Sequence, residues 1–275
     1  MAIVLSLLSA LAYGVSDFLG GILAKRAPAW QIAVVGQTSS GVFSLAAAIV
    51  IGGSPTGHDL LFGALAGLGG GFGAAFLYRG LATARMSVVA PLSGVGTALI
   101  PAVVGLVTGD RPSTWALLGI VVAFPAIVLI SRVSDDSPAH RSGIVDGILA
   151  GVGFGLLFTF LGQVGDEGGL YPLAMSQVTS ILSVIITAII LRQSWVPRER
   201  AAWNAAVMGP LGALAQGSFL YATQHGLLSI VSVISSLYPA STVLLAAIIL
   251  REKIQRWQAV GLVAAAAAVA LVAAG

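Results

Sequence analysis

The sequence contains no cysteine and very few charged residues. With no cysteine among 275 residues, disulfides, thiol nucleophiles and cysteine-bound metals are excluded. Charged residues make up 8% of the chain and hydrophobic residues 57%, whereas a soluble domain carries about 25% charged residues. The net charge of +3 is small and spread along the chain, so no basic surface for nucleic acid is expected. This composition predicts an integral membrane protein.

Sequence motifs of enzymes are also missing. The chain contains no HExxH zinc motif, no phosphate-binding Walker loop and no cluster of metal ligands. Its three histidines, His58, His140 and His225, fall in loops or at the ends of apolar runs, which does not favour a Ser-His-Asp triad. We therefore expect a protein that is not an enzyme and binds no cofactor or metal.

Ten apolar runs are each long enough to cross a bilayer as a helix. The runs are continuous and do not alternate, which favours helices over a β-barrel. Short connections rich in glycine and proline separate them and leave no room for a soluble domain. The predicted fold is an all-α integral membrane protein with ten transmembrane helices. The runs are residues 2–24, 29–51, 60–80, 87–107, 114–131, 143–163, 170–191, 202–222, 229–250 and 256–274.

The chain contains an internal repeat. Residues 87–119 match residues 229–261 without a gap at an offset of 142, which places Ser93 on Ser235 and Trp115 on Trp257. Upstream, the match continues at offsets of 140 to 143. A repeat of this length predicts two homologous units, residues 1–133 and 142–275, joined by a loop at 134–141. Five spans per unit is an odd number, so the units are inverted relative to each other, as in many secondary transporters.

Basic residues predict the orientation in the membrane. Twelve of the 13 lysines and arginines belong to odd-numbered loops, and Arg111 alone belongs to an even-numbered one. Because cytoplasmic loops carry the excess of basic residues, the odd loops are predicted in the cytoplasm and both termini outside. The predicted location is the cell inner (plasma) membrane.

These features resemble a known family, the drug/metabolite transporter superfamily in its EamA-type exporter branch. The resemblance implies export of amino acids or related small metabolites by alternating access. Thr97 departs from it at the position of a family proline, and Phe158 occupies the second-half position that matches Asp17. The residues that carry the resemblance are Tyr78-Arg79-Gly80-Leu81, Gly109-Asp110-Arg111 with Gly119, and Pro239 followed by Arg251-Glu252-Lys253 and Gly261.

Asp17 is the one acidic residue predicted well inside a span. A carboxylate in the membrane is costly and is a functional candidate by default. The alternative is a structural acid near the interface, hydrogen-bonded by Ser16 or paired with a basic residue. Small multidrug resistance proteins are similar in having an acid followed eight positions later by a lysine, here Lys25, which implies alternating binding of protons and cationic drugs. Asp17 is thus the coupling candidate, and without coupling we expect facilitated diffusion.

Polar and aromatic side chains inside the spans are predicted to line a central cavity, although any single hydroxyl can instead join two helices. Arg79 either extends to the cytoplasmic interface or meets a substrate carboxylate. The candidate hinges are Pro91, Pro101 and Pro239. The cavity candidates are Tyr13, Asp17, Gln37, Tyr78, Ser93, Gln177, Gln216, Ser235, Ser236 and Tyr238.

Small residues recur at every fourth position in two spans, for example Gly63, Gly67 and Gly71. Such stripes allow close helix packing, and we expect it within each half.

Two rivals to metabolite export remain open. One is proton-coupled efflux of cationic drugs through Asp17, and the other is a membrane assembly or lipid-handling protein that transports nothing. The expected partners are a small-molecule substrate, the lipid bilayer and, in the first rival, protons. A monomer can suffice because both repeats lie in one chain.

Overall fold

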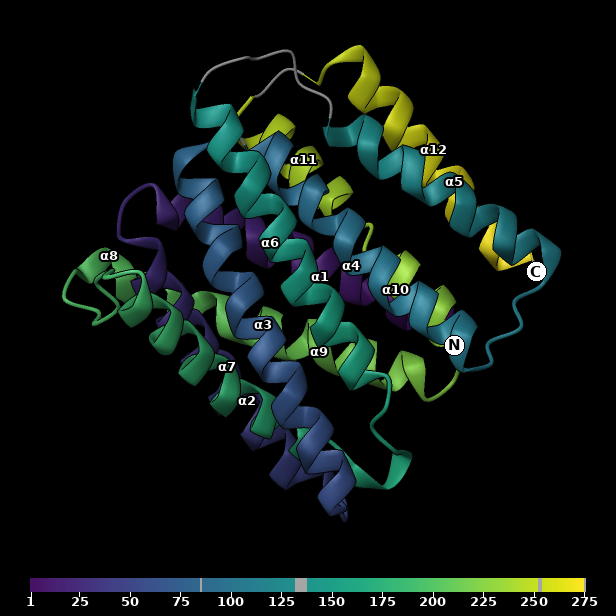
Figure 1. Ribbon diagram of the computed structural model, residues 1–275, viewed down its shortest axis with the longest axis horizontal. Helices are drawn as coiled ribbons and strands as arrows, with labels where there is room; N and C mark the ends of the chain where they lie inside the picture. Colours follow the sequence, from purple (N-terminus) through teal and green to yellow (C-terminus); the bar gives the residue numbers. More distant parts are fainter. Residues whose placement is uncertain (85, 132–137, 252–253, 275) are drawn as a thin grey trace.

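The computed structural model describes residues 1–84, 86–131, 138–251 and 254–274, and in these ranges every regular element is helical (Figure 1). Predictions that fall on Arg85, Arg132, 134–137, Glu252, Lys253 and Gly275 lie outside the described residues. The first half contains α1 (Ala2–Ala24), α2 (Ala29–Ile51), α3 (Gly57–Thr83), α4 (Met86–Thr108) and α5 (Thr114–Ser131). The second half contains α6 (Pro138–Leu161), η1 (Asp166–Gly168), α7 (Tyr171–Ile190), α8 (Arg200–Trp203), η2 (Asn204–Val207), α9 (Met208–Thr223), α10 (Leu228–Ser235), α11 (Tyr238–Ile249) and α12 (Arg256–Ala274).

Seven stretches of the described chain are long and apolar enough to cross a membrane: α1, α2, α3, α4, α6, α7 and the stretch of α10 with α11. Helices α5 and α12 are apolar but shorter in their described parts. The prediction of an all-helical membrane protein therefore agrees with the structure. One boundary differs, since α6 begins at Pro138, within the segment predicted as the joining loop.

Two predicted spans are divided. The eighth run consists of α8, the 3-10 turn η2 and α9, and the ninth consists of α10 and α11 with a break at Ser236 and Leu237. A proline lacks the amide proton and its ring collides with the carbonyl four residues earlier. Pro210 stands four residues after the middle of η2, and Pro239 stands four residues after the end of α10. Both irregularities therefore follow from the local sequence.

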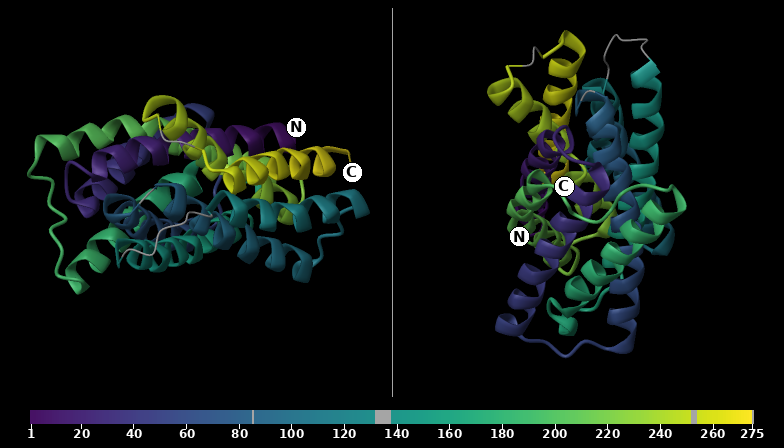
Figure 2. Two further views of the ribbon diagram at one scale, coloured as in Figure 1. Left: turned by 90° about the horizontal axis from the view of Figure 1, so that it is seen from above. Right: turned by 90° about the vertical axis from the view of Figure 1, so that its left-hand side faces the viewer.

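The helices pack into two bundles that mix the predicted halves. Helix α1 packs against α9, α10 and α11, a group that we name the α1 bundle. Helix α6 packs against α3 and α4, a group that we name the α6 bundle. Helices α2 and α7 contact each other, and α5 lies beside α12 at one edge of the molecule (Figures 1 and 2). Each bundle therefore contains helices from before and after the joining loop.

The glycine stripe of α3 corrects the prediction of packing within each half. A Cβ atom at Gly67 would lie 1.9 Å from the carbonyl oxygen of Ser176, and one at Gly71 would lie 2.1 Å from that of Ser180. Both carbonyls belong to α7, in the second half. The stripe thus joins the two halves, because a helix without side chains along one face can touch the backbone of its neighbour.

Candidate functional site

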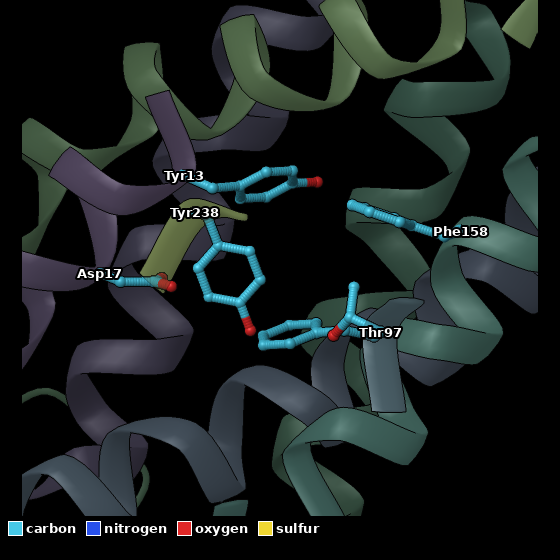
Figure 3. Close-up of a pocket in the computed structure, with 6 residues that line it drawn as sticks. Tyr13, Asp17, Thr97, Phe158 and Tyr238 are labelled. Carbon is cyan, nitrogen blue, oxygen red and sulfur yellow. The ribbon is translucent and has the colours of Figure 1, made fainter. Parts of the chain in front are cut away.

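A small cavity lies where the two bundles meet, and each bundle supplies three of its lining residues. Its volume is about 10 Å³, which is space for about one water molecule. In Figure 3, Asp17 and Phe158 stand on opposite sides of it. The lining residues are Tyr13 and Asp17 of α1, Tyr238 of α11, Thr97 of α4, and Phe154 and Phe158 of α6.

Asp17 is 5% exposed, and no hydrogen bond or ion pair of its carboxylate occurs within the described part of the chain. Lys25 is exposed and forms no ion pair with any described residue. The hydroxyls of Tyr13, Tyr78 and Tyr238 lie near enough to interact with the charge of the Asp17 carboxylate. A purely structural role for Asp17 would require a hydrogen bond from Ser16 or a basic partner. Neither contact occurs among the described residues.

Aromatic rings form most of the remaining wall. The ring of Tyr13 lies 5.8 Å from that of Phe158 and 6.2 Å from that of Tyr238, measured between centroids. Phe158 in turn stacks on Phe219 at 3.9 Å with an interplanar angle of 22°. The hydroxyl of Tyr13 is buried without a hydrogen-bond partner among the described residues. The cavity therefore combines one carboxylate, one unused hydroxyl and a largely apolar surface.

A hydrogen bond between Ser93 and Tyr238 joins the two bundles beside Asp17. The Ser93 hydroxyl lies 2.7 Å from the carbonyl oxygen of Ala90 and donates to it, so the Tyr238 hydroxyl donates to Ser93 Oγ. Thr97 follows one turn later and donates to the carbonyl of Ser93 at 2.7 Å. Ser93 belongs to α4 and Tyr238 to α11, so this bond connects opposite walls of the cavity.

Gln37 and Tyr78 line a second cavity of about 30 Å³, to which α1 contributes Ser16 and α2 contributes Ser40. The ring of Tyr78 lies against α1, since a Cβ at Gly20 would be 2.4 Å from its Cε1. These two predicted residues are therefore close to the first cavity but do not line it.

Two reciprocal hydrogen bonds hold α2 against α7. Gln37 Nε2 donates to Ser180 Oγ at 2.7 Å, and Gln177 Nε2 donates to Ser40 Oγ at 3.1 Å. The pairs are exchanged at the sequence offset of 140 that relates Gln37 to Gln177 and Ser40 to Ser180. The two glutamines therefore act as links between helices.

Three other cavity candidates lie elsewhere. Ser235 Oγ donates to the carbonyl of Ser6 at 3.4 Å, and Ser236 Oγ donates to that of Ser232 at 2.6 Å, next to the break before α11. Gln216 accepts a hydrogen bond from Ser176 at 3.3 Å. None of the three lines either cavity.

Arg79 has a partner that we did not anticipate from the sequence. Its Nε donates to Oδ1 of Asp146 at 3.0 Å and its Nη2 contacts the same oxygen, while the guanidinium lies 4.4 Å from the ring centroid of Phe76. Asp146 is 3% exposed, and the Arg79 side chain is 35% exposed. The sequence signal for this pair was slight: a basic residue, Arg79, near the end of the third span and an acidic residue, Asp146, near the start of the sixth.

Phe154 and Phe158 were not among the predicted site residues, although the repeat contains the signal for them. They follow Tyr13 and Asp17 by 141 residues, and all four line the first cavity.

The three prolines that were predicted as hinges differ in their surroundings. Pro91 and Pro101 stand inside the continuous helix α4, whereas Pro239 is the second residue of α11, just after a break.

Comparisons with known proteins agree with this architecture. A solved structure, described only as "Crystal structure of protein", matches with a TM-score of 0.72 at 17% sequence identity, over 98% of this chain and 95% of the other. At that identity the likeness concerns the fold alone. No curated protein matches the sequence. The model of the EamA-like transporter family matches twice, over residues 1–132 and 141–274, which together cover nearly the whole chain. The chain therefore belongs to the EamA-like transporter family.

Proposed function

We propose that this protein is a secondary transporter that moves a small organic solute by alternating access, and that the cavity at Asp17 is its binding site. The observation that carries the proposal is a buried carboxylate without a described partner at the junction of two bundles. A buried unpaired charge is costly unless a ligand or a proton neutralises it. Family membership supports a membrane transporter of small molecules.

The moving bodies in this proposal are the α1 bundle and the α6 bundle. The packing mixes the two sequence halves, so the bundles and not the halves are the bodies that separate in this proposal. A cavity of about 10 Å³ accommodates water and no organic solute, so the bundles must separate before a solute binds. Separation breaks the hydrogen bond between Ser93 and Tyr238, and the break before Pro239 lets α10 and α11 reorient as two short segments.

The chemistry of the lining favours a solute with a cationic group. Asp17 attracts an ammonium group or a proton, and none of the described residues that line the cavity is basic. Arg79 is engaged by Asp146 and so does not offer a cation to a substrate carboxylate. An exported amino acid would place its ammonium at Asp17 and leave its carboxylate without a partner. The cation-efflux alternative therefore fits the lining better than amino acid export does.

A single carboxylate that binds either a proton or a cationic solute couples the two by competition. When a proton occupies Asp17 the solute leaves, and when the solute binds the proton leaves, so a proton gradient drives efflux. If Asp17 took up no proton during the transport cycle, the same cavity would support facilitated diffusion instead.

Counterflow in proteoliposomes tests the function. A labelled panel of amino acids and small aromatic amines is applied with and without a pH gradient, to wild type, Asp17→Asn and the control Asp166→Asn, which alters an exposed carboxylate on η1. Amine transport that follows the gradient and is lost only in Asp17→Asn supports the proposal. Failure of the wild type to move any solute revives the non-transporting alternative.

The membrane orientation is a separate proposal that rests on the basic residues. We propose an inner-membrane protein with both termini outside the cytoplasm. A reporter fused after the C-terminal residue that is active only outside the cytoplasm supports it, and activity only in the cytoplasm contradicts it.

A further inference from the structure

The second half of the repeat carries a phenyl ring, that of Phe158, at the position that corresponds to the carboxylate of Asp17. Tyr13 and Asp17 of α1 correspond to Phe154 and Phe158 of α6 at one offset of 141. All four residues line the cavity, and Asp17 and Phe158 stand on opposite sides of it (Figure 3). The two walls are therefore built from matching positions, but among the described lining residues the charge lies on the α1 wall alone.

Phe158 is held firmly in its place. It is 1% exposed, stacks on Phe219 and contacts the ring of Tyr13. Phe154 and Phe158 are the two residues that α6 contributes to the cavity, so the α6 wall is aromatic and apolar. Aromatic faces attract a cation that is already held nearby and pack against a flat apolar group.

Charge counting limits what this cavity can hold. One positive charge is neutralised by Asp17, while a second positive charge would lie against the phenyl wall without a partner. An unpaired charge in a buried site is strongly disfavoured. A negative charge on the solute faces the same penalty, since the lining contains no basic side chain within the described part of the chain.

We propose that the site selects organic cations with a single positive charge and one flat apolar group, and that Phe158 determines this selectivity. The cationic group lies at Asp17 and the apolar group lies against Phe158. This inference rests on the proposed function of the cavity as a binding site and adds the substrate class and a specificity-determining residue.

Three probes that share one benzene ring test the charge limit. They are 2-phenylethylammonium with one positive charge, p-xylylenediammonium with two, and phenylalanine as a zwitterion. Binding to the purified full chain in lipid nanodiscs is measured by isothermal titration. We expect the wild type to prefer the monocation over each of the others by at least about tenfold.

Substitution of Phe158 by an acidic residue is expected to shift the preference toward the dication. Phe158→Asp supplies a second carboxylate and is expected to raise the dication-to-monocation affinity ratio by at least about tenfold. Phe158→Asn is the matched control, because asparagine has nearly the shape of aspartate but no charge. Its dication-to-monocation affinity ratio should stay near that of the wild type. Should Phe158→Asp fail to fold, Phe154→Asp places a carboxylate on the same wall and serves the same comparison.

An exchange of the two walls tests their correspondence. Asp17→Phe alone should lose monocation binding, and the double variant Asp17→Phe with Phe158→Asp should regain at least about a tenth of the wild-type affinity.

The outcomes separate the two proposals. If the wild type binds the monocation through Asp17 but Phe158→Asp and Phe158→Asn give the same ratio, this inference is overturned while the binding site stands. If Asp17→Asn binds every probe as the wild type does, the proposed site itself is wrong and this inference falls with it.

Discussion

Asp17 and Asp146 are both buried carboxylates, with 5% and 3% of their surface exposed, but their surroundings differ. Asp146 accepts hydrogen bonds from Arg79, and the two residues join α3 and α6 within one bundle. Asp17 has no such partner in the described part of the chain and lies between two bundles. Burial alone therefore does not identify a functional acid in this molecule. The pairing of each carboxylate and its position relative to the two bundles distinguish Asp17 from Asp146.

The largest expected effect comes from removing the unpaired charge. Asp17→Asn should lower transport of 2-phenylethylammonium by about 100-fold, because the cation loses the one charged group of the cavity. The thermal stability in detergent should not fall, since the variant removes a buried charge that has no described partner. Initial rates in proteoliposomes and a melting curve measure both. Retained transport in Asp17→Asn would show that Asp17 is not the group that binds the cation.

The second effect, on the paired carboxylate, should reverse this pattern. Arg79→Gln leaves Asp146 buried without its cation and should destabilise the fold by about 2 kcal/mol, less than for a fully buried pair because the guanidinium is partly exposed. Transport per folded molecule should stay within about twofold of wild type, and Arg79→Lys should recover part of the stability. A loss of transport at unchanged stability would instead make Arg79 part of the substrate site.

A smaller effect is expected at the bond between the bundles. Tyr238→Phe removes the hydrogen bond to Ser93 without changing the shape of the ring, which should favour separation of the bundles by about 1 kcal/mol, or about fivefold. Because the chain contains no cysteine, Thr97→Cys supplies a unique label in the cavity. Its reaction rate with a maleimide should rise in the Tyr238→Phe background. An unchanged rate would show that this bond does not hold the cavity closed.

The smallest effect is expected at the uncharged side chains Gln37 and Gln177, which form hydrogen bonds between α2 and α7. Gln37→Leu and Gln177→Leu each remove one of the reciprocal bonds between α2 and α7 and should each cost about 1 kcal/mol of stability. Transport should remain near the wild-type rate in both. A loss of transport in only one variant would indicate that this glutamine has a role beyond joining the helices.

The sequence predicted the helical elements because their signals are local. Long apolar runs define the helices, and Pro239 explains a break from its own covalent chemistry. The mixed bundles were not predicted, because the glycine stripe of α3 shows that a close neighbour exists but does not identify it as α7. Which helix fills a stripe depends on contacts between distant segments.

The residues that line the first cavity were predicted in part, and their role as a binding site stays a proposal. Asp17 was found because a charge inside an apolar run is conspicuous, and Tyr13 and Tyr238 line the same cavity. Ser235 and Ser236 were assigned to the cavity from their spacing, but they donate to backbone carbonyls next to a helix break. Phe158 is apolar in an apolar helix, so only its correspondence with Asp17 distinguishes it.

The most direct test of the account is whether a solute and a proton exchange at Asp17. Purified protein in weakly buffered solution is mixed with 2-phenylethylammonium over a series of pH values, and released protons are followed with an indicator dye. We expect proton release on binding by the wild type and by Arg79→Gln, and none by Asp17→Asn. Equal proton release from Asp17→Asn, or cation binding by the wild type without release at any pH, would contradict the claim that one carboxylate serves both ligands.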